Sequence, residues 1–372
     1  MLKSDKKEIY FGIERDKARY FHGRKEELNH FRNLLNESKI KGIGSSFLIQ
    51  GAPGIGKTAL IHECVGIAKK SKWNVVKINI ETLSNPTDLF YRITKDSDPK
   101  TYIHAQKVDL ALWKTELRTK TKEEINYVNE ELIKSKPTLL VLDETQNLGI
   151  DGAFSNDKKG EIIAFLEKFH NLKTKKGFAF LFAGLSNTKD VLKEFGISRF
   201  NSKYSFNLQP LDKESERAII RDWINEKVKG DEAIEGWIDK ITPKTYQWAK
   251  HITSYCNAIH NQLQKVKKLS KETLQNVLDE GDYLKKDYYS QRCVGLLRED
   301  REILAKLVQT LPNVFTKTQV IDFLSKENSL LETQKFFDFL MVRGIFHLGI
   351  DGDFSISMPS FKTWLVEQYG GE

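Results

Sequence analysis

The chain has 372 residues, more than one hydrophobic core usually holds, so we expect two or three domains. Its 40% apolar and 30% charged residues are typical of a globular protein, and its net charge of +8 is compatible with a polyanionic partner without identifying one. No window approaches the ~20 uncharged residues of a membrane helix, and the first residues lack the apolar stretch of a signal peptide, so we expect a cytoplasmic protein with no membrane partner.

Residues 1–210 alternate short apolar runs with helix-length segments. Five runs rich in β-branched, Leu and Phe residues read as strands, namely Ser45–Gln50, Trp73–Ile80, Thr138–Leu142, Phe178–Ala183 and Tyr204–Leu208. Between the first two, residues 57–70 place apolar side chains, Cys64 among them, on one helical face. This alternation predicts an α/β fold with a three-layer parallel sheet. The three cysteines include no Cys-x-x-Cys pair, which argues against a disulfide framework and a zinc site.

Strand patterns stop after residue 210. Residues 212–289 read as successive helices, and the acidic run at 212–216 suits a helix N-terminus. Further helices are predicted near Glu299–Leu311, Lys317–Ser325 and Leu330–Val342, followed by a β-hairpin whose turn is Asp351-Gly352. We therefore predict three domains: an α/β core at 1–210, an all-helical lid at 211–294 and a winged helix-turn-helix at 295–372.

Residues 51–58 read Gly-Ala-Pro-Gly-Ile-Gly-Lys-Thr and match the phosphate-loop pattern G-x-x-x-x-G-K-[ST]. In such a loop the glycines let backbone N–H groups surround phosphates, Lys57 places a cation on the β and γ phosphates, and Thr58 binds Mg²⁺. The predicted strand before the loop and the amphipathic helix after it give the pattern its expected context. We therefore predict a site for ATP and Mg²⁺. The residues expected to hold the nucleotide here are Gly51, Pro53, Gly54, Ile55, Gly56, Lys57, Thr58 and Ala59.

A second element is the buried strand that begins at Thr138 and ends in the adjacent carboxylates Asp143 and Glu144. Burying two acids at a strand end is costly unless a cation or hydrogen bonds compensate, and a Mg²⁺ held by Thr58 would supply that compensation. We expect Asp143 to orient the water shell of the metal and Glu144 to polarise the attacking water. The alternative is a strand that simply ends in an acidic turn.

These elements together resemble the AAA+ ATPases, and within them the origin-recognition-like and archaeal-type ATPases that end in a winged helix; the prokaryotic transposon ATPases are neighbours. Residues 21–28, Phe-His-Gly-Arg-Lys-Glu-Glu-Leu, are similar to the Phe-x-Gly-Arg-x-x-Glu-Leu segment of this family, whose backbone lies along the adenine. The resemblance therefore implies that Gly23 and Arg24 belong to the nucleotide site.

The resemblance also implies two further catalytic groups. After the predicted strand Phe178–Ala183 the family carries a first sensor near the γ phosphate, a place that Asn187 or Ser186 would fill; either residue could instead cap the following helix. Before the fifth strand the family carries an arginine finger, for which Arg199 is the candidate. A finger acting in trans would make hydrolysis depend on a homo-oligomer, whereas a surface arginine or a pair within one subunit is the alternative.

At the start of a lid helix, related ATPases carry Gly-x-Pro-Arg as a second sensor. Only the basic position is kept here, as Lys250, with Gln247 and Ala249 in place of glycine and proline. A second sensor and a merely solvated lysine are therefore both open for Lys250. The next residue, His251, fits a packing histidine better than a ligand.

The C-terminal region leaves DNA and protein partners open. A winged helix commonly reads DNA with one helix, yet the polar residues of the candidate helix are neutral in sum and the turn at 351–353 is acidic. Residues 295–372 hold 8 basic and 11 acidic side chains, so the positive excess lies in the first 294 residues. Basic clusters at 69–72, 173–176 and 265–268 could line a nucleic-acid channel in an oligomer or be solvated ends, and the long segment 94–137 could be an effector insertion.

We therefore interpret the chain as an ATP-hydrolysing molecular switch. One hypothesis places it in a nucleic-acid-associated process, namely replication, transposition or defence. The other is a signalling ATPase whose winged helix is a protein-docking or autoinhibitory surface. A non-hydrolysing transcription regulator is disfavoured because Asp143 and Glu144 are both present.

Overall fold

The computed structural model describes residues 20–41, 45–80, 137–149, 160, 177–197, 200–327, 333–349 and 351–370. The predicted α/β core is confirmed as a five-stranded parallel sheet with the order β2-β3-β4-β1-β5. The strands are β1 (Ser45–Gln50), β2 (Asn74–Asn79), β3 (Thr138–Asp143), β4 (Phe178–Gly184) and β5 (Ser205–Asn207). The last strand is shorter than predicted because Tyr204 belongs to the 3-10 turn η3 (Ser202–Tyr204). The segment 94–136 and the basic cluster 173–176 lie outside the described residues.

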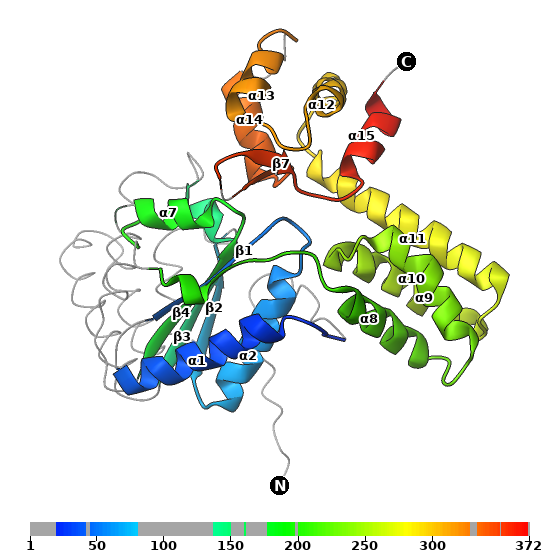
Figure 1. Cartoon of the computed structure of the whole chain (residues 1–372), viewed down its shortest axis with the longest axis horizontal. Coiled ribbons are helices and arrows are strands. Elements are labelled where there is room, and N and C mark those ends of the chain that lie inside the picture. The colour runs from blue at the N-terminus through cyan, green and yellow to red at the C-terminus, as the bar shows by residue number, and fades with distance from the viewer. Residues whose placement is uncertain are drawn as a thin grey trace, which may run out of the picture.

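Helices cover both faces of this sheet (Figure 1). On one face, α1 (Lys25–Lys41) and α2 (Lys57–Lys70) contribute apolar side chains to the same buried cluster as Phe47 of β1 and Leu181 of β4. The alternate strand residues form a second cluster with α7 (Thr188–Glu194) and its flanks. This alternation along strands buried on both faces produces the three-layer architecture that the sequence predicted.

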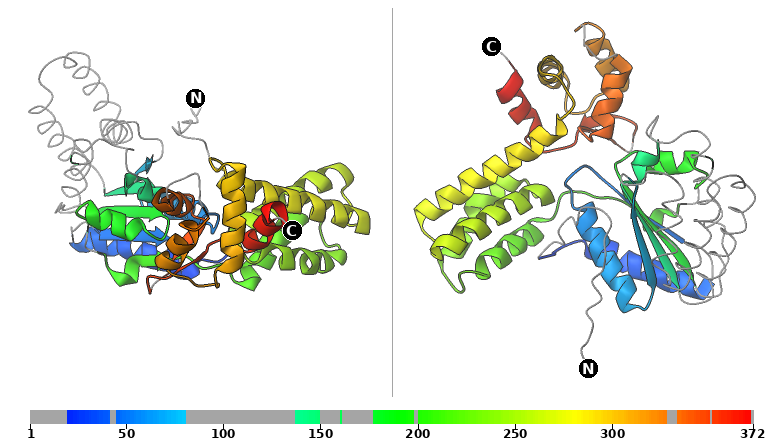
Figure 2. Two further views of the ribbon diagram at one scale, coloured as in Figure 1. Left: turned by 90° about the horizontal axis from the view of Figure 1, so that it is seen from above. Right: turned by 180° about the vertical axis from the view of Figure 1, so that it is seen from behind.

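The region after the sheet is helical, as predicted. It consists of α8 (Lys213–Asn225), α9 (Ala233–Thr245), α10 (Ala249–Val266) and α11 (Lys271–Arg292), which lie beside the core in Figures 1 and 2. Asp212 caps α8, since its Oδ1 accepts a 2.7 Å hydrogen bond from Ser215 N, so this helix begins where the acidic run indicated. The four helices share a core of their own that includes Trp237 and Tyr255.

The C-terminal region follows the predicted element order as far as the hairpin, after which comes a helix, α15 (Phe361–Tyr369), that was not predicted. It contains α12 (Arg298–Thr310), α13 (Lys317–Leu324), α14 (Thr333–Val342), β6 (Phe346–Leu348), β7 (Phe354–Ile356) and α15. The strands β6 and β7 form an antiparallel hairpin, and Phe315 extends it through backbone hydrogen bonds of 2.7 and 2.9 Å with Phe354. The assignment of these elements as a winged helix, and the domain boundaries at 210 and 294, stay predictions.

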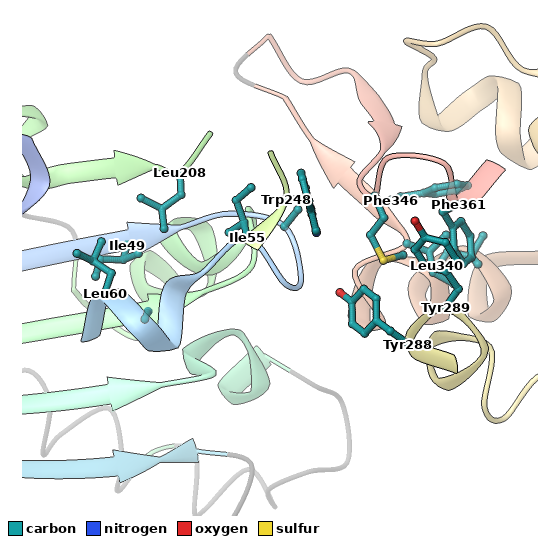
Figure 3. Packing of buried hydrophobic residues seen from close by; sticks show 14 of the residues in the cluster. Ile49, Ile55, Leu60, Leu208, Trp248, Tyr288, Tyr289, Leu340, Phe346 and Phe361 are labelled. Atoms are coloured by element: carbon teal, nitrogen blue, oxygen red, sulfur yellow. The ribbon is translucent and has the colours of Figure 1, made fainter. Parts of the chain in front are cut away.

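One apolar cluster connects the three regions (Figure 3). It runs from Ile55 in the phosphate loop through Trp248 and the α11 residues Tyr288 and Tyr289 to Phe361 at the C-terminal end. The C-terminal elements are therefore packed on the rest of the chain through a buried apolar contact, which favours one fixed arrangement over a loosely tethered one.

His251 is a buried polar group in this contact, and both of its ring nitrogens have hydrogen-bond partners. His251 is fully buried, with Nδ1 3.1 Å from Thr245 O and Nε2 3.0 Å from Tyr289 Oη. Burial lowers the pKa of His251 to about 3, so the ring is neutral at physiological pH and serves as the packing histidine that the sequence predicted. Within the described ranges, no helix is both long and apolar enough to span a bilayer.

Candidate nucleotide site

The phosphate loop connects β1 to α2 at the carboxyl edge of the sheet. Gly54 and Gly56 have φ angles of +73° and +104°, a left-handed backbone that glycine adopts without strain. Helix α2 begins at Lys57 with no acidic side chain in its first turn, so no carboxylate of that turn offsets the positive end of its dipole. Free N–H groups at a helix start, preceded by a glycine-rich turn, form an anion site of the size of a phosphate.

Lys57 is held over this turn. Its side chain is 7% exposed, and Nζ donates hydrogen bonds to Gly51 O at 2.8 Å and Ala52 O at 3.1 Å. A buried ammonium group needs such acceptors, and the two carbonyls keep Nζ at the loop itself. The predicted cation is therefore positioned at the predicted phosphate site.

Asp143 ends β3, one strand away from β4 and two from β1, and is 4% exposed. Its Oδ1 accepts a 3.0 Å hydrogen bond from Glu144 N. Burial and then the neighbouring charge of Glu144 raise the pKa of Asp143, while Lys77 and Lys57 oppose the rise. A cation beside this carboxylate would remove the cost of burying it, as the sequence analysis expected.

Glu144 follows in the left-handed region with φ +52°, which is uncommon for a residue with a side chain. Its carboxylate is held by Gln146, whose Nε2 donates a 2.8 Å hydrogen bond to Glu144 Oε2. The strand therefore does not end in a simple acidic turn: an unusual backbone conformation and a side-chain hydrogen bond determine where the carboxylate lies.

The loop Leu185–Asn187 follows β4 and contains both candidates for the first sensor, whose side chains have different surroundings. Ser186 Oγ accepts a 3.0 Å hydrogen bond from Leu348 N in β6, so its hydroxyl is engaged by the C-terminal hairpin. Asn187 stands at the N-cap of α7 but makes no side-chain cap hydrogen bond, so the alternative that it serves as a side-chain cap is wrong. Asn187 Oδ1 is buried without a hydrogen-bond partner among the described residues, which leaves it available to a ligand.

The N-terminal segment that carries Gly23 and Arg24 lies between the loop and the lid. Arg24 Nη2 donates to Ile55 O in the phosphate loop at 3.3 Å and to Gln209 O, and burial lowers the pKa of its guanidinium. Gly23, with φ +81°, approaches Ser215 of α8 so closely that a Cβ would lie 2.9 Å from its Oγ. These contacts connect the segment to both sides of the site, while its predicted role toward adenine stays a prediction.

The turn before α10 touches the phosphate loop from the lid side. Lys250 N donates to Gly54 O at 2.8 Å, and Trp248 Nε1 donates to Pro53 O at 3.2 Å. The Lys250 ammonium lies 5.7 Å from the centroid of the Tyr288 ring. Lys250 thus borders the loop where the second sensor was predicted, and whether it binds phosphate stays a prediction.

The structure adds one residue to the predicted site, Gln146, and does not describe another, Arg199. Gln146 was missed: it is polar, two residues after Glu144, and nothing in the local pattern predicts that it folds back onto the carboxylate. Arg199, the predicted arginine finger, lies outside the described residues.

The donor set fits Mg²⁺ and a nucleoside triphosphate. Thr58 and Asp143, the predicted metal ligands, would offer hard oxygen atoms to such an ion, and the parts of the chain that the structure describes contain no group of three or more His, Cys, Asp or Glu side chains suited to a metal. A magnesium ion held by one or two protein oxygens completes its shell with phosphate oxygens and water, which agrees with this sparse set. Asn187, whose Oδ1 is unpartnered among the described residues, follows β4, and the glycine turn follows the parallel strand β1, so both lie at the carboxyl edge of the sheet.

Comparison with known families agrees with this site. The sequence profile described as the AAA ATPase domain matches residues 20–155, a range that includes the phosphate loop and Glu144. The chain carries an AAA ATPase domain. Among curated proteins, none matches it in sequence.

Solved structures share the fold of this AAA ATPase domain and of the helices after it. A Walker-type ATPase of Pyrococcus abyssi is 16% identical, with a TM-score of 0.59, and the match covers 94% of this chain and 98% of that chain. The ORC2 protein of Aeropyrum pernix in its ADP form is 12% identical, with a TM-score of 0.60 over 96% and 97% of the two chains. The Aeropyrum pernix ORC1 protein in complex with DNA is 13% identical, with a TM-score of 0.50 over 94% of each chain. At these identities the similarity is one of fold.

Proposed function

We propose that this protein is an ATP-hydrolysing AAA+ molecular switch that acts as an oligomer in a nucleic-acid-associated process such as replication, transposition or defence. The observation that carries the proposal is the arrangement at the carboxyl edge of the sheet. There Lys57 lies after β1 and Asn187 after β4. Between these two strand ends and the outer strand β2, Asp143 ends β3 and Glu144 follows it directly. These are the groups that phosphoryl transfer to water requires: a phosphate cation, a metal ligand, a carboxylate and a polar donor.

In this proposal each group has one task. The glycine turn and Lys57 bind the phosphates, Thr58 and Asp143 hold Mg²⁺, and Glu144 orients the attacking water. An ion held by Thr58 and Asp143 would supply positive charge to the phosphates. Arg199 would supply a further cation from a neighbouring subunit, which is the reason to expect that the active form is an oligomer.

Two observations support a nucleic-acid partner. The net charge of +8 comes from the first 294 residues, and one of the structures that share the fold, the Aeropyrum pernix ORC1 protein, was solved in complex with DNA. Lys and Arg side chains bind nucleic acids chiefly through the phosphates, which gives affinity without sequence specificity.

The direct test is phosphate release measured with ATP and Mg²⁺, with and without duplex DNA. We expect hydrolysis that stops when EDTA removes the metal, a rate that rises with DNA, and DNA binding that weakens steeply between low and high salt because counterions compete for the phosphates. Absence of hydrolysis under every condition would refute the ATPase. Hydrolysis that ignores DNA, with no salt-dependent binding, would refute the nucleic-acid process.

A specific contact favours the second candidate function, an ATPase switch inhibited by its own C-terminal region. The hairpin and the turn before it contact two loops at the carboxyl edge of the sheet. Leu348 N donates to Ser186 Oγ at 3.0 Å, and Gly344, two residues before β6, lies so close to Pro53 of the phosphate loop that a Cβ there would overlap its ring. Burial, and after it the charge of Lys57, lowers the pKa of His347 in β6. A docked hairpin would restrict the loops that must rearrange around ATP.

This candidate predicts that Gly344→Ala increases the ATPase rate several-fold, because the added methyl group separates the hairpin from Pro53. Gly352→Ala is the matched control, since Gly352 also has a positive φ, +86°, but has open space at its Cβ. Steady-state hydrolysis by both variants and the wild type gives the answer. A Gly344→Ala rate equal to or below that of Gly352→Ala would argue against inhibition by the hairpin.

A further inference from the structure

The polar side chain of Gln146 connects Glu144, directly after β3, to the loop that follows β4. It lies in the 3-10 helix η2 (Thr145–Gly149) directly after β3 and is 6% exposed. Its Nε2 donates to Glu144 Oε2 at 2.8 Å, and its Oε1 accepts from Leu185 N at 3.1 Å. Both ends of one buried amide are therefore used, one on the carboxylate and one on the backbone after β4.

The surroundings leave this amide little freedom. Gly184, the last residue of β4, is the neighbour: a Cβ at this position would overlap Gln146 Oε1 and Thr188 Oγ1. The backbone of η2 is itself tied to the strand end, because Asn147 N donates to Glu144 O at 3.0 Å and Thr145 Oγ1 donates to Leu142 O at 2.8 Å. A glycine at 184 thus makes room for the amide, and the short helix holds it against the carboxylate.

Glu144 needs such support. Its φ of +52° gives the side chain an uncommon starting direction, and the adjacent Asp143 carboxylate, buried and bound to Glu144 N, repels it. An unrestrained glutamate side chain has several rotamers, of which only some direct the carboxylate toward a water at the γ phosphate. The Gln146 amide, which is itself anchored on Leu185 N, donates to the carboxylate and thereby selects among these rotamers.

We infer that Gln146 is a positioning residue for ATP hydrolysis, which holds the Glu144 carboxylate in place by bridging it to Leu185 N. The inference rests on the proposed hydrolytic function. It also connects catalysis to the loop Leu185–Asn187, which carries the predicted sensor Asn187 and whose Ser186 accepts the hydrogen bond from Leu348 of the C-terminal hairpin. A shift of this loop would therefore move the Glu144 carboxylate through the side chain of Gln146.

The test uses the full-length protein and separates kcat from KM and from nucleotide affinity. Gln146→Met keeps the length of the side chain and removes both hydrogen bonds; Gln146→Glu keeps an acceptor for Leu185 N and removes the donor to Glu144. We expect both variants to lower kcat roughly 10- to 100-fold, the scale on which about 1 Å of misplacement acts, with the ATP dissociation constant within about twofold of the wild type. Asn147→Leu, a change of the neighbouring amide with no side-chain bond to Glu144, is the matched control and should retain the wild-type kcat.

A second measurement excludes a purely structural role. Single-turnover hydrolysis by the Glu144→Gln protein should fall no further when Gln146→Met is added, because a residue that acts through Glu144 has nothing left to position. If Gln146→Met does not fold, Gln146→Glu decides on its own. Wild-type kcat in Gln146→Glu, or a loss equal to that of Asn147→Leu, overturns the inference, whereas a wild-type protein that hydrolyses no ATP overturns the proposed function instead.

Discussion

Replacement of Lys57 by alanine is expected to abolish tight ATP binding. The ammonium group sits over the glycine turn, 2.8 Å from Gly51 O and 3.1 Å from Ala52 O, where the β and γ phosphates of a bound nucleotide would lie. Hydrogen bonds to charged groups contribute about 1.5–3 kcal/mol each, and Lys57 would serve two phosphates. We therefore expect the dissociation constant for ATP to rise by roughly 100-fold or more, measured by titration calorimetry.

Lys70→Ala is the matched control for this change. Lys70 is an exposed lysine at the other end of the same helix, α2, so its loss removes the same charge without touching the loop. Its affinity for ATP should equal that of the wild type. An unchanged affinity in Lys57→Ala, with the control also unchanged, would mean that the glycine turn is not the nucleotide site.

Glu144→Gln is expected to bind ATP normally and to stop turnover. The amide has the shape of the carboxylate and loses the charge that polarises water, and general-base catalysis contributes about 10²- to 10⁴-fold. Calorimetry should therefore give the wild-type dissociation constant while phosphate release falls by about that factor. The exposed Glu194→Gln, which makes the same change at the end of α7, should hydrolyse at the wild-type rate.

Mixing Glu144→Gln with Arg199→Ala tests the proposed oligomer. An interface that pairs the intact Glu144 of one subunit with the intact Arg199 of another restores one complete site, so two inactive proteins should regain partial activity together. Wild-type turnover in Glu144→Gln would remove Glu144 from the mechanism. No recovery in a mixture that demonstrably assembles would place Arg199 within its own subunit or outside the reaction.

The elements that local pattern governs could be predicted with little error. The five strands were found to within one or two residues. The central strands β1, β3 and β4 are buried along most or all of their length and read as continuous apolar runs bounded by turn residues. The start of α8 at Asp212 and the hairpin around Asp351-Gly352 follow from capping and turn chemistry, which act within four or five residues. The phosphate loop belongs to the same class, since its function depends on its own backbone.

Choices between neighbouring side chains could not be predicted. The sequence left Asn187 or Ser186 for the first sensor, and the structure shows their different surroundings: Ser186 accepts a hydrogen bond from Leu348, 162 positions away along the chain, whereas Asn187 Oδ1 has no partner among the described residues. The same holds for Gln146, whose partner Leu185 belongs to another strand end. Periodicity reports which face of an element is apolar, but it carries no information about which polar atoms meet across the fold.

By itself the sequence determined the α/β architecture, the place of the nucleotide site and the pair Asp143 and Glu144, because each depends on residue types at short, fixed spacings. Only the tertiary structure decided that the amide of Gln146 holds Glu144 and that Gly344, just before the C-terminal hairpin, packs against Pro53. Those contacts depend on how helices and strands pack, and packing is the joint result of many buried side chains from distant parts of the chain, such as Ile55, Tyr288 and Phe361 in one cluster. A buried polar group finds its partner after that packing is complete, so its role is a property of the fold and not of the local sequence.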